Sequence, residues 1–124
     1  MAKKVLIVDD KQDICSALKL LIEYEGYEVV IAMDGREALA QTLEHMPDLI
    51  LMDLMDLAMP GLNGIEATLL IRSNPLTTHI PIICVSSYGD IYKGDVLAAG
   101  SNEVHTKTSF IEAFSGTLEK YLER

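Results

Sequence analysis

Cysteine, basic charge and long apolar runs are all scarce in this sequence. Its two cysteines, Cys15 and Cys84, lie far apart, so the close spacings typical of zinc sites and redox motifs are absent. Both are therefore predicted to be small core residues in a reducing compartment. Ten Lys and Arg residues stand against 19 Asp and Glu residues, and the formal net charge of −9 argues against direct binding to nucleic acid or an anionic membrane.

The apolar runs are too short for membrane targeting or insertion. The first run, Val5 to Val8, is shorter than the apolar region of a signal peptide, and no later run approaches the length of a membrane span. We therefore expect a cytoplasmic protein. Linkers, repeats and low-complexity tracts are also absent, so residues 1–124 are predicted to form a single domain with no separate output domain.

Short apolar strands alternate with amphipathic helices along the chain. Runs bounded by turn residues predict five strands, at Val5–Val8, Glu28–Ala32, Leu49–Met52, Ile80–Ser86 and Val104–Thr106. Apolar residues at helical spacing predict five helices, at Gln12–Tyr24, Arg36–Met46, Gly64–Ser73, Asp90–Ala99 and Ser109–Leu122. In the second and fifth helices, the residues predicted to face inward are Ala38, Leu39, Thr42, Leu43, Ile111, Phe114, Leu118 and Tyr121.

This alternation predicts an α/β fold, with a five-stranded parallel sheet covered by helices on both faces. In a flavodoxin-like, doubly wound sheet the strand order is 2-1-3-4-5, and sites form where the first and third strands are neighbours. The carboxyl ends of parallel strands share one edge of the sheet. We therefore expect Asp9 and Asp10 to lie beside Asp53, with Ser86 and Lys107 on the same edge.

Three carboxylates, one hydroxyl and one ammonium at this edge point to phosphate and metal chemistry. Two unit charges 4 Å apart repel by about 4 kcal/mol at an effective dielectric constant of 20, so clustered acids call for a cation among them. Carboxylate oxygens suit Mg²⁺, and an aspartate can itself accept a phosphoryl group. A lysine ammonium and a serine hydroxyl would then contact the phosphoryl oxygens.

This ordered set of motifs resembles the receiver domain of two-component response regulators, above all the single-domain kind similar to the chemotaxis regulator. The segments that carry the resemblance are VLIVDD at 5–10, PDLILMD at 47–53, MPGLNG at 59–64, IPIICVS at 80–86, and Lys107. Together they extend over almost the whole chain, and their order is more specific than any one of them.

The resemblance implies a phosphorylation-controlled signalling switch rather than an enzyme, with only slow self-phosphorylation and dephosphorylation of its own. It makes Asp53 the phosphoryl acceptor and gives the phosphoryl contacts to Ser86 and Lys107. The implied Mg²⁺ ligands are Asp9, Asp10, Asp53 and the backbone carbonyl of Met55. The implied partners are a histidine kinase or histidine phosphotransfer protein and a downstream protein target, and the protein is expected to be a monomer or weak dimer.

The loop after Asp53 departs from the family pattern, because Met-Asp-Leu occurs at both 52–54 and 55–57. Counting forward from Pro47 makes Asp53 the acceptor, whereas counting back from Pro60 makes it Asp56. We favour Asp53, since extra residues are better tolerated in a surface loop than in a buried strand. Asp56 is kept as the alternative.

Two further departures concern Lys107. The family's aromatic residue three positions earlier is replaced by Val104, and the proline that normally follows the lysine is replaced by Thr108. These changes leave open a second function, a degenerate receiver that binds partners without being phosphorylated. A flavodoxin-type FMN site is disfavoured, because Asp9 and Asp10 would repel a phosphate at the end of the first strand.

Overall fold

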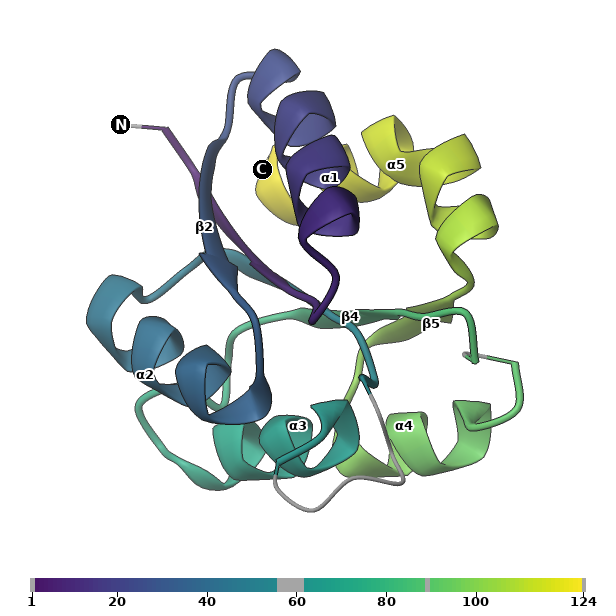
Figure 1. The fold of residues 1–124 in the computed structure, drawn as a ribbon. Coiled ribbons are helices and arrows are strands. Elements are labelled where there is room, and N and C mark those ends of the chain that lie inside the picture. Colours follow the sequence, from purple (N-terminus) through teal and green to yellow (C-terminus); the bar gives the residue numbers. More distant parts are fainter. Residues whose placement is uncertain (1, 56–61, 89, 124) are drawn as a thin grey trace.

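The computed structural model describes residues 2–55, 62–88 and 90–123, which form a five-stranded parallel sheet between two layers of helices (Figure 1). The strands are β1 (Lys4–Val8), β2 (Glu28–Ala32), β3 (Leu49–Met52), β4 (Ile82–Val85) and β5 (Glu103–His105). The helices are α1 (Gln12–Tyr24), α2 (Gly35–His45), α3 (Gly64–Ser73), α4 (Lys93–Ala99) and α5 (Lys107–Leu122). The sheet order is β2-β1-β3-β4-β5, which confirms the predicted flavodoxin-like topology.

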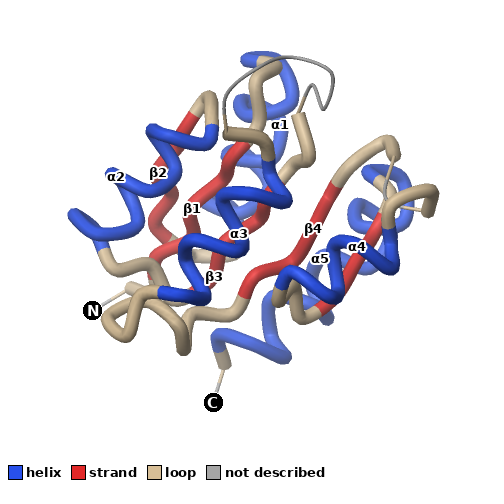
Figure 2. The backbone as a smooth tube through the Cα atoms, turned by 90° about the horizontal axis from the view of Figure 1, so that it is seen from below, coloured by secondary structure: helices blue, strands red, loops and turns tan. Residues whose placement is uncertain are grey.

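The two faces of the sheet are covered by different helices. Figures 1 and 2 show α1 and α5 on one face and α2, α3 and α4 on the other. Successive strand residues point to opposite faces, so alternate positions of β1 enter different cores. Val5 and Ile7 pack with the α1 and α5 side chains, whereas Leu6 and Val8 pack with those of α2 and α3. Cys15 and Cys84 are both buried, which confirms their prediction as core residues.

Some predicted boundaries were wrong where a turn replaces regular structure. The predicted strand at 80–86 is shorter, because the Ile80 N–H bonds to the Thr77 carbonyl in a turn. The predicted helix at 90–99 begins only at Lys93, since the N–H groups of Ile91 and Tyr92 first bond to the Tyr88 carbonyl. The strand at 5–8 also includes Lys4, and the helix at 36–46 runs from Gly35 to His45.

The start of α5 differs from the prediction in a way that affects the site. Thr106 was predicted to end the fifth strand, but its hydroxyl oxygen accepts a hydrogen bond from the Ser109 N–H and caps the helix. A threonine in this position satisfies one of the free N–H groups of the first turn. Consequently α5 begins at Lys107 rather than at Ser109, and β5 ends at His105.

Two residues predicted to face inward lie at the surface. Leu43 and Ile111 are 50% and 43% exposed, whereas Phe110 is fully buried. In the first turns of α5, Phe110 rather than Ile111 enters the core beside α1. The other predicted inward residues of α2 and α5 are buried or partly buried.

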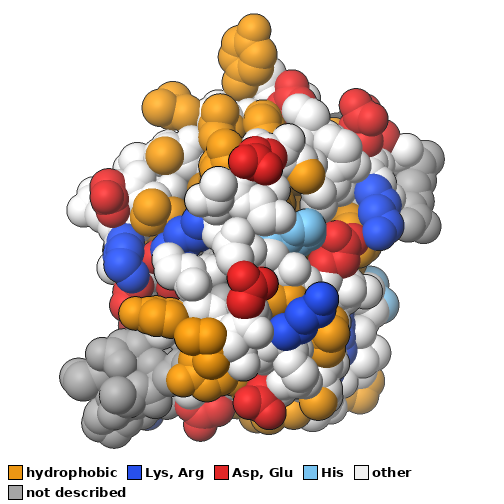
Figure 3. Space-filling view, turned by 90° about the vertical axis from the view of Figure 1, so that its right-hand side faces the viewer, with side chains coloured by type: hydrophobic (Ala, Val, Ile, Leu, Met, Phe, Trp, Pro, Cys, Tyr) orange, Lys and Arg blue, Asp and Glu red, His pale blue; other side chains and the backbone are white. Residues whose placement is uncertain are grey.

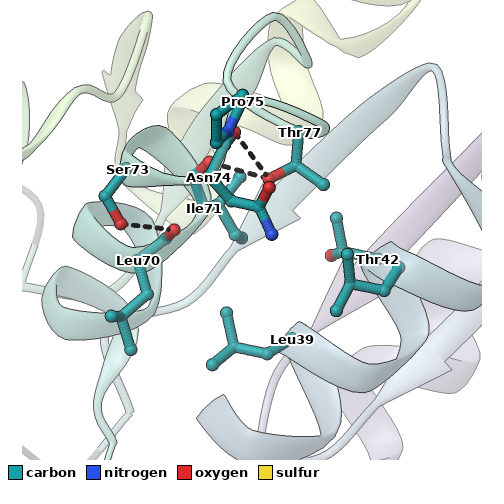
Figure 4. A pocket seen from close by; sticks show the side chains of 9 residues that line it. Leu39, Thr42, Leu70, Ile71, Ser73, Asn74, Pro75 and Thr77 are labelled. Atoms are coloured by element: carbon teal, nitrogen blue, oxygen red, sulfur yellow. Dashed lines mark hydrogen bonds between the residues drawn. The ribbon is translucent and has the colours of Figure 1, made fainter.

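An apolar groove of about 450 Å³ separates α2 from α3 (Figure 4). Leu39 and Leu43 line one side, and Leu70 and Ile71 line the other. Its hydroxyl groups donate to backbone carbonyls, and none of the described residues that line it is charged. The groove lies towards the end of α3, away from the carboxyl ends of the strands. Within the described residues, no helix is both long and apolar enough to cross a membrane.

Candidate functional site

The hydrogen-bond ladder of the sheet extends one residue beyond three strands and fixes three predicted site residues. The Asp9 N–H donates to the Ala32 carbonyl at 3.1 Å, and the Asp53 N–H donates to the Val8 carbonyl at 2.8 Å. Likewise, the Ser86 N–H donates to the His105 carbonyl at 3.1 Å. These backbones are therefore as firmly held as the strands themselves, although their side chains lie at the open edge of the sheet.

Three carboxylates meet at this edge, as predicted from the order of the strands. One oxygen from each of Asp9, Asp10 and Asp53 lies within 4.8 Å of the other two. Asp9 and Asp53 are only 2% and 4% exposed, whereas Asp10 faces solvent. Oxygens bound to one Mg²⁺ ion lie about 3–4 Å apart, so these side chains fit such an ion after a small movement.

Lys107 supplies positive charge to the two buried acids. Its ammonium nitrogen lies 3.1 Å from Asp9 Oδ2 and 3.9 Å from Asp53 Oδ1. The side chain is 20% exposed, so solvent screens these contacts only in part. Lys107 is the first residue of α5, and the position of this helix therefore determines where the ammonium lies.

The environment of Asp53 acts on its pKa in both directions. Burial and the neighbouring charge of Asp9 raise the pKa of Asp53. The Lys107 ammonium, the Met55 N–H and a hydrogen bond from the Ser86 hydroxyl act in the opposite direction. The same three groups stabilise negative charge on the Asp53 oxygens.

Met55 has an unusual backbone conformation beside Asp53. Its φ of 62° lies in the left-handed region, which a residue with a bulky side chain seldom adopts. In this conformation its N–H donates to Asp53 Oδ2 at 2.9 Å, while its side chain packs with Leu6 and Val8 in the core. The predicted contact of its carbonyl with a metal ion stays a prediction.

The start of α3 lies directly against the backbone that follows β3. The Gly64 N–H donates to the Leu54 carbonyl at 3.1 Å. A Cβ atom on Gly64 would lie 2.2 Å from the Asp53 carbonyl oxygen and 2.9 Å from Leu54 Cα. Glycine is therefore required at this position by close backbone approach, and α3 is held tightly against the residue that carries the site's central carboxylate.

The structure brings together all five side chains singled out from the sequence: Asp9, Asp10, Asp53, Ser86 and Lys107. The alternative acceptor, Asp56, lies outside the described residues. Sequence reasoning missed two backbone donors, the N–H groups of Met55 and Lys11, which bond to the carboxylates of Asp53 and Asp9. Each donor lies two residues after its carboxylate, a spacing at which an aspartate often bonds to its own backbone.

The two departures near Lys107 lie on different sides of β5. Val104 is partly buried and packs with Leu54 and Cys84 on the α4 side of the sheet. Thr108 is exposed in the first turn of α5. Among the described residues, no hydrogen bond or ion pair joins Val104 or Thr108 to the carboxylates of Asp9, Asp10 and Asp53.

A polar cluster on the other side of β5 links this strand to both ends of α5. Glu103 Oε1 lies 3.0 Å from His105 Nε2, and Glu103 Oε2 contacts Lys120 at 2.8 Å and the Tyr121 hydroxyl. Figure 3 shows this side of the molecule, where acidic and basic side chains are scattered over the surface. Burial opposes ionisation, but hydrogen bonds from Lys120, Tyr121 and His105 lower the pKa of Glu103 to about 2.

Glu103→Gln should lower the free energy of unfolding above pH 4.5 by about 1 kcal/mol, because partly exposed ion pairs contribute little. The pKa of Glu103 falls from 4.5 to about 2 on folding, so its contribution is complete above pH 4.5 and is lost as the pH falls towards 2. Urea unfolding of both proteins between pH 6 and pH 3 measures this difference. A gap that stays constant over this range would contradict the prediction.

Comparison with known proteins gives consistent matches over nearly the whole chain. A family model of the response regulator receiver domain matches residues 5–117. The polar-differentiation response regulator DivK of Brucella anthropi is 34% identical over 125 residues, covering 98% of both chains.

Solved structures match equally well. Chemotaxis protein CheY4 of Vibrio cholerae superposes with a TM-score of 0.85 at 30% identity, covering 98% of this chain and 100% of its own. The response regulator domain of Thermotoga maritima CheB superposes with a TM-score of 0.81 at 33% identity, covering 99% of this chain and 96% of its own.

Proposed function

Because this chain belongs to the response regulator receiver domain family, we propose that it is a phosphorylation-controlled switch in two-component signalling. Asp53 accepts a phosphoryl group from a histidine kinase or a histidine phosphotransfer protein, and a downstream protein target reads the change. The protein acts in the cytoplasm as a phosphorylated signalling component rather than as a multiple-turnover enzyme. Its own chemistry is limited to slow phosphorylation and dephosphorylation of Asp53.

One observation carries this proposal: the buried Asp53 carboxylate is surrounded by the groups that phosphoryl transfer needs. The Lys107 ammonium lies 3.9 Å from one of its oxygens, and the Met55 N–H lies 2.9 Å from the other. The Ser86 hydroxyl forms a further hydrogen bond to it. A carboxylate placed only for stability would have no need of three donors and two neighbouring acids.

The chemical step follows from this arrangement. A carboxylate oxygen of Asp53 attacks the phosphorus atom of the phosphohistidine donor. A new P–O bond forms while the P–N bond breaks, and its electron pair returns to the imidazole nitrogen. Lys107 and Ser86 then contact the phosphoryl oxygens, because positioning and charge stabilisation supply most of the catalysis in phosphoryl transfer.

The residues present fit a magnesium ion. Asp9, Asp10 and Asp53 would hold it, together with the carbonyl of Met55 that the family resemblance implies. When bound, the ion neutralises charge on the acids and on the incoming phosphoryl oxygens. Asp10 is the acid best placed to meet an ion that enters from solvent, since it is exposed while Asp9 and Asp53 are buried.

The proposal is tested by incubating the protein with acetyl phosphate and then with the histidine kinases of the source organism. Wild-type protein should be labelled by acetyl phosphate in the presence of Mg²⁺ and not in the presence of EDTA. One kinase should then label it much faster than the others. Failure of every donor, with binding to a protein target retained, would favour the phosphorylation-independent module instead.

Magnesium should raise the melting temperature of the wild-type protein. A ligand at 100 times its dissociation constant stabilises the native state by about 2.7 kcal/mol, which corresponds to several degrees. Asp10→Asn should lose most of this increase, because the amide is a weaker metal ligand. In EDTA the same substitution should not lower the melting temperature, since it removes one of three clustered negative charges. Equal responses of both proteins to Mg²⁺ would count against the metal site.

A further inference from the structure

A continuous chain of polar contacts runs from Glu103 to the helix turn that carries Lys107. Glu103 Oε1 lies 3.0 Å from His105 Nε2, and His105 Nδ1 lies 3.4 Å from the Ser109 hydroxyl. The Ser109 N–H in turn donates to the Thr106 hydroxyl oxygen at 3.1 Å. Lys107 lies between Thr106 and Ser109, inside the turn that these contacts close.

His105 is held from several directions. Its ring meets that of Phe110 edge-on, with the ring centres 6.2 Å apart, and its side chain is only 19% exposed. Its backbone carbonyl accepts the Ser86 N–H. The residue therefore connects to both groups proposed to contact the phosphoryl oxygens, through its backbone to Ser86 and through its ring to the turn of Lys107.

The ionised carboxylate of Glu103 determines which nitrogen of the His105 ring donates a hydrogen bond. A carboxylate only accepts hydrogen bonds, so His105 Nε2 must carry a proton towards it. In the neutral ring, Nδ1 is then an acceptor for the Ser109 hydroxyl. Lys120 and the Tyr121 hydroxyl contact the other oxygen of Glu103, and so anchor the chain of contacts to the far end of α5.

We propose that His105 is a positioning residue for Lys107: through Ser109 it fixes the first turn of α5, so that the ammonium faces Asp9 and Asp53. The inference rests on the proposed function, in which Lys107 contacts the phosphoryl group. It also accounts for the absence of a proline after Lys107. Where the ring of a proline would restrict the backbone, this chain has a capped helix start and a side-chain contact from the neighbouring strand.

Two substitutions separate the two ring nitrogens of His105. The amide of asparagine reaches about as far as Nδ1, so His105→Asn keeps an acceptor for Ser109 and loses the contact with Glu103. The longer glutamine reaches about as far as Nε2, so His105→Gln keeps a donor to Glu103 and loses the contact with Ser109. Ser109→Ala breaks the same contact from the other side, and leaves the backbone N–H bonded to Thr106.

The first measurement does not depend on phosphorylation. Hydrogen exchange of the Lys107 ammonium, followed by NMR, reports whether the ion pair with Asp9 is held. We expect exchange to be accelerated in His105→Gln and Ser109→Ala, and to stay near the wild-type rate in His105→Asn. Unchanged exchange in the first two variants would overturn the proposal. Equal acceleration in all three would also overturn it, because His105 would then act only through its packing.

The second measurement is the rate of labelling over a series of acetyl phosphate concentrations, which gives both the saturating rate and KM. Misplacing a catalytic group by about 1 Å can cost up to a hundredfold in rate, and we expect a fall of about tenfold in His105→Gln and Ser109→Ala. His105→Asn should stay within about twofold of wild type, with KM little changed in all three variants. Wild-type rates in His105→Gln and Ser109→Ala would overturn the proposal. A wild-type protein that is never labelled would contradict the proposed function. The hydrogen-exchange rates of the Lys107 ammonium would still decide the role of His105.

Discussion

Asp53→Asn should abolish labelling of the protein by acetyl phosphate and Mg²⁺, whereas Asp56→Asn should remain labelled. The expected loss is complete, because an amide oxygen does not form the acyl phosphate. Asp53 directly follows β3, and its N–H continues the sheet ladder to Val8. Its carboxylate also lies within reach of Asp9 and Lys107.

The two single variants are best compared with the double variant Asp53→Asn/Asp56→Asn, all at equal protein concentration. Mass spectrometry of the labelled protein, after reduction of the acyl phosphate with borohydride, gives the modified position directly. Labelling that survives in Asp53→Asn and disappears in Asp56→Asn would reverse the assignment. Asp56 lies outside the described residues, so this experiment is the direct test of the alternative.

Gly64→Ala should strongly destabilise the protein. The added methyl group would lie 2.2 Å from the Asp53 carbonyl oxygen and 2.9 Å from Leu54 Cα. Both are backbone atoms, so relief requires α3 to move away from the end of β3. Overpacking of this kind costs about 3 kcal/mol, and here it also displaces Asp53. Labelling by acetyl phosphate should therefore fall together with the free energy of unfolding in urea.

Gly116→Ala is the matched control, because it adds the same methyl group within another helix. Apart from the neighbouring residues and the nearby backbone of α5 itself, no atom lies within 4 Å of the added Cβ, and alanine favours a helix by about 1 kcal/mol over glycine. This variant should therefore be slightly more stable than wild type and should be labelled at the wild-type rate. A Gly64→Ala protein as stable as Gly116→Ala would show that the end of β3 and the start of α3 are not tightly packed.

The fold could be predicted because the residue patterns of its strands clearly favour strands. The run Leu49–Met52 is apolar throughout and is bounded by turn residues, as a strand buried on both faces requires. The strands beside β3 were predicted from the order typical of a parallel, doubly wound sheet and not from any local sequence signal. The meeting of Asp9 and Asp53 was therefore predicted as well, since the strand order alone brings their strands together.

The parts that could not be predicted depend on residues with two plausible conformations. Thr106 is β-branched and suits a strand, but it also suits a helix cap, and only its contact with Ser109 decides between them. Met55 gives no sequence signal for a left-handed backbone. Glu103 and His105 do share a strand face because they are two residues apart, yet their contact with α5 needed the three-dimensional position of that helix.

The place of β1 between β2 and β3 has a consequence for how the chain reaches its native state. Lys4 pairs with Glu28 and Val5 with Leu49, so β1 is synthesised before both of its neighbours in the sheet and must wait for them. Pairings between distant segments slow folding and leave apolar edges exposed in the meantime. Lys107 follows β5, so the nascent chain carries Asp9 and Asp53 for some time without the Lys107 ammonium. The charge arrangement around Asp53 is therefore completed only after all five strands have been synthesised.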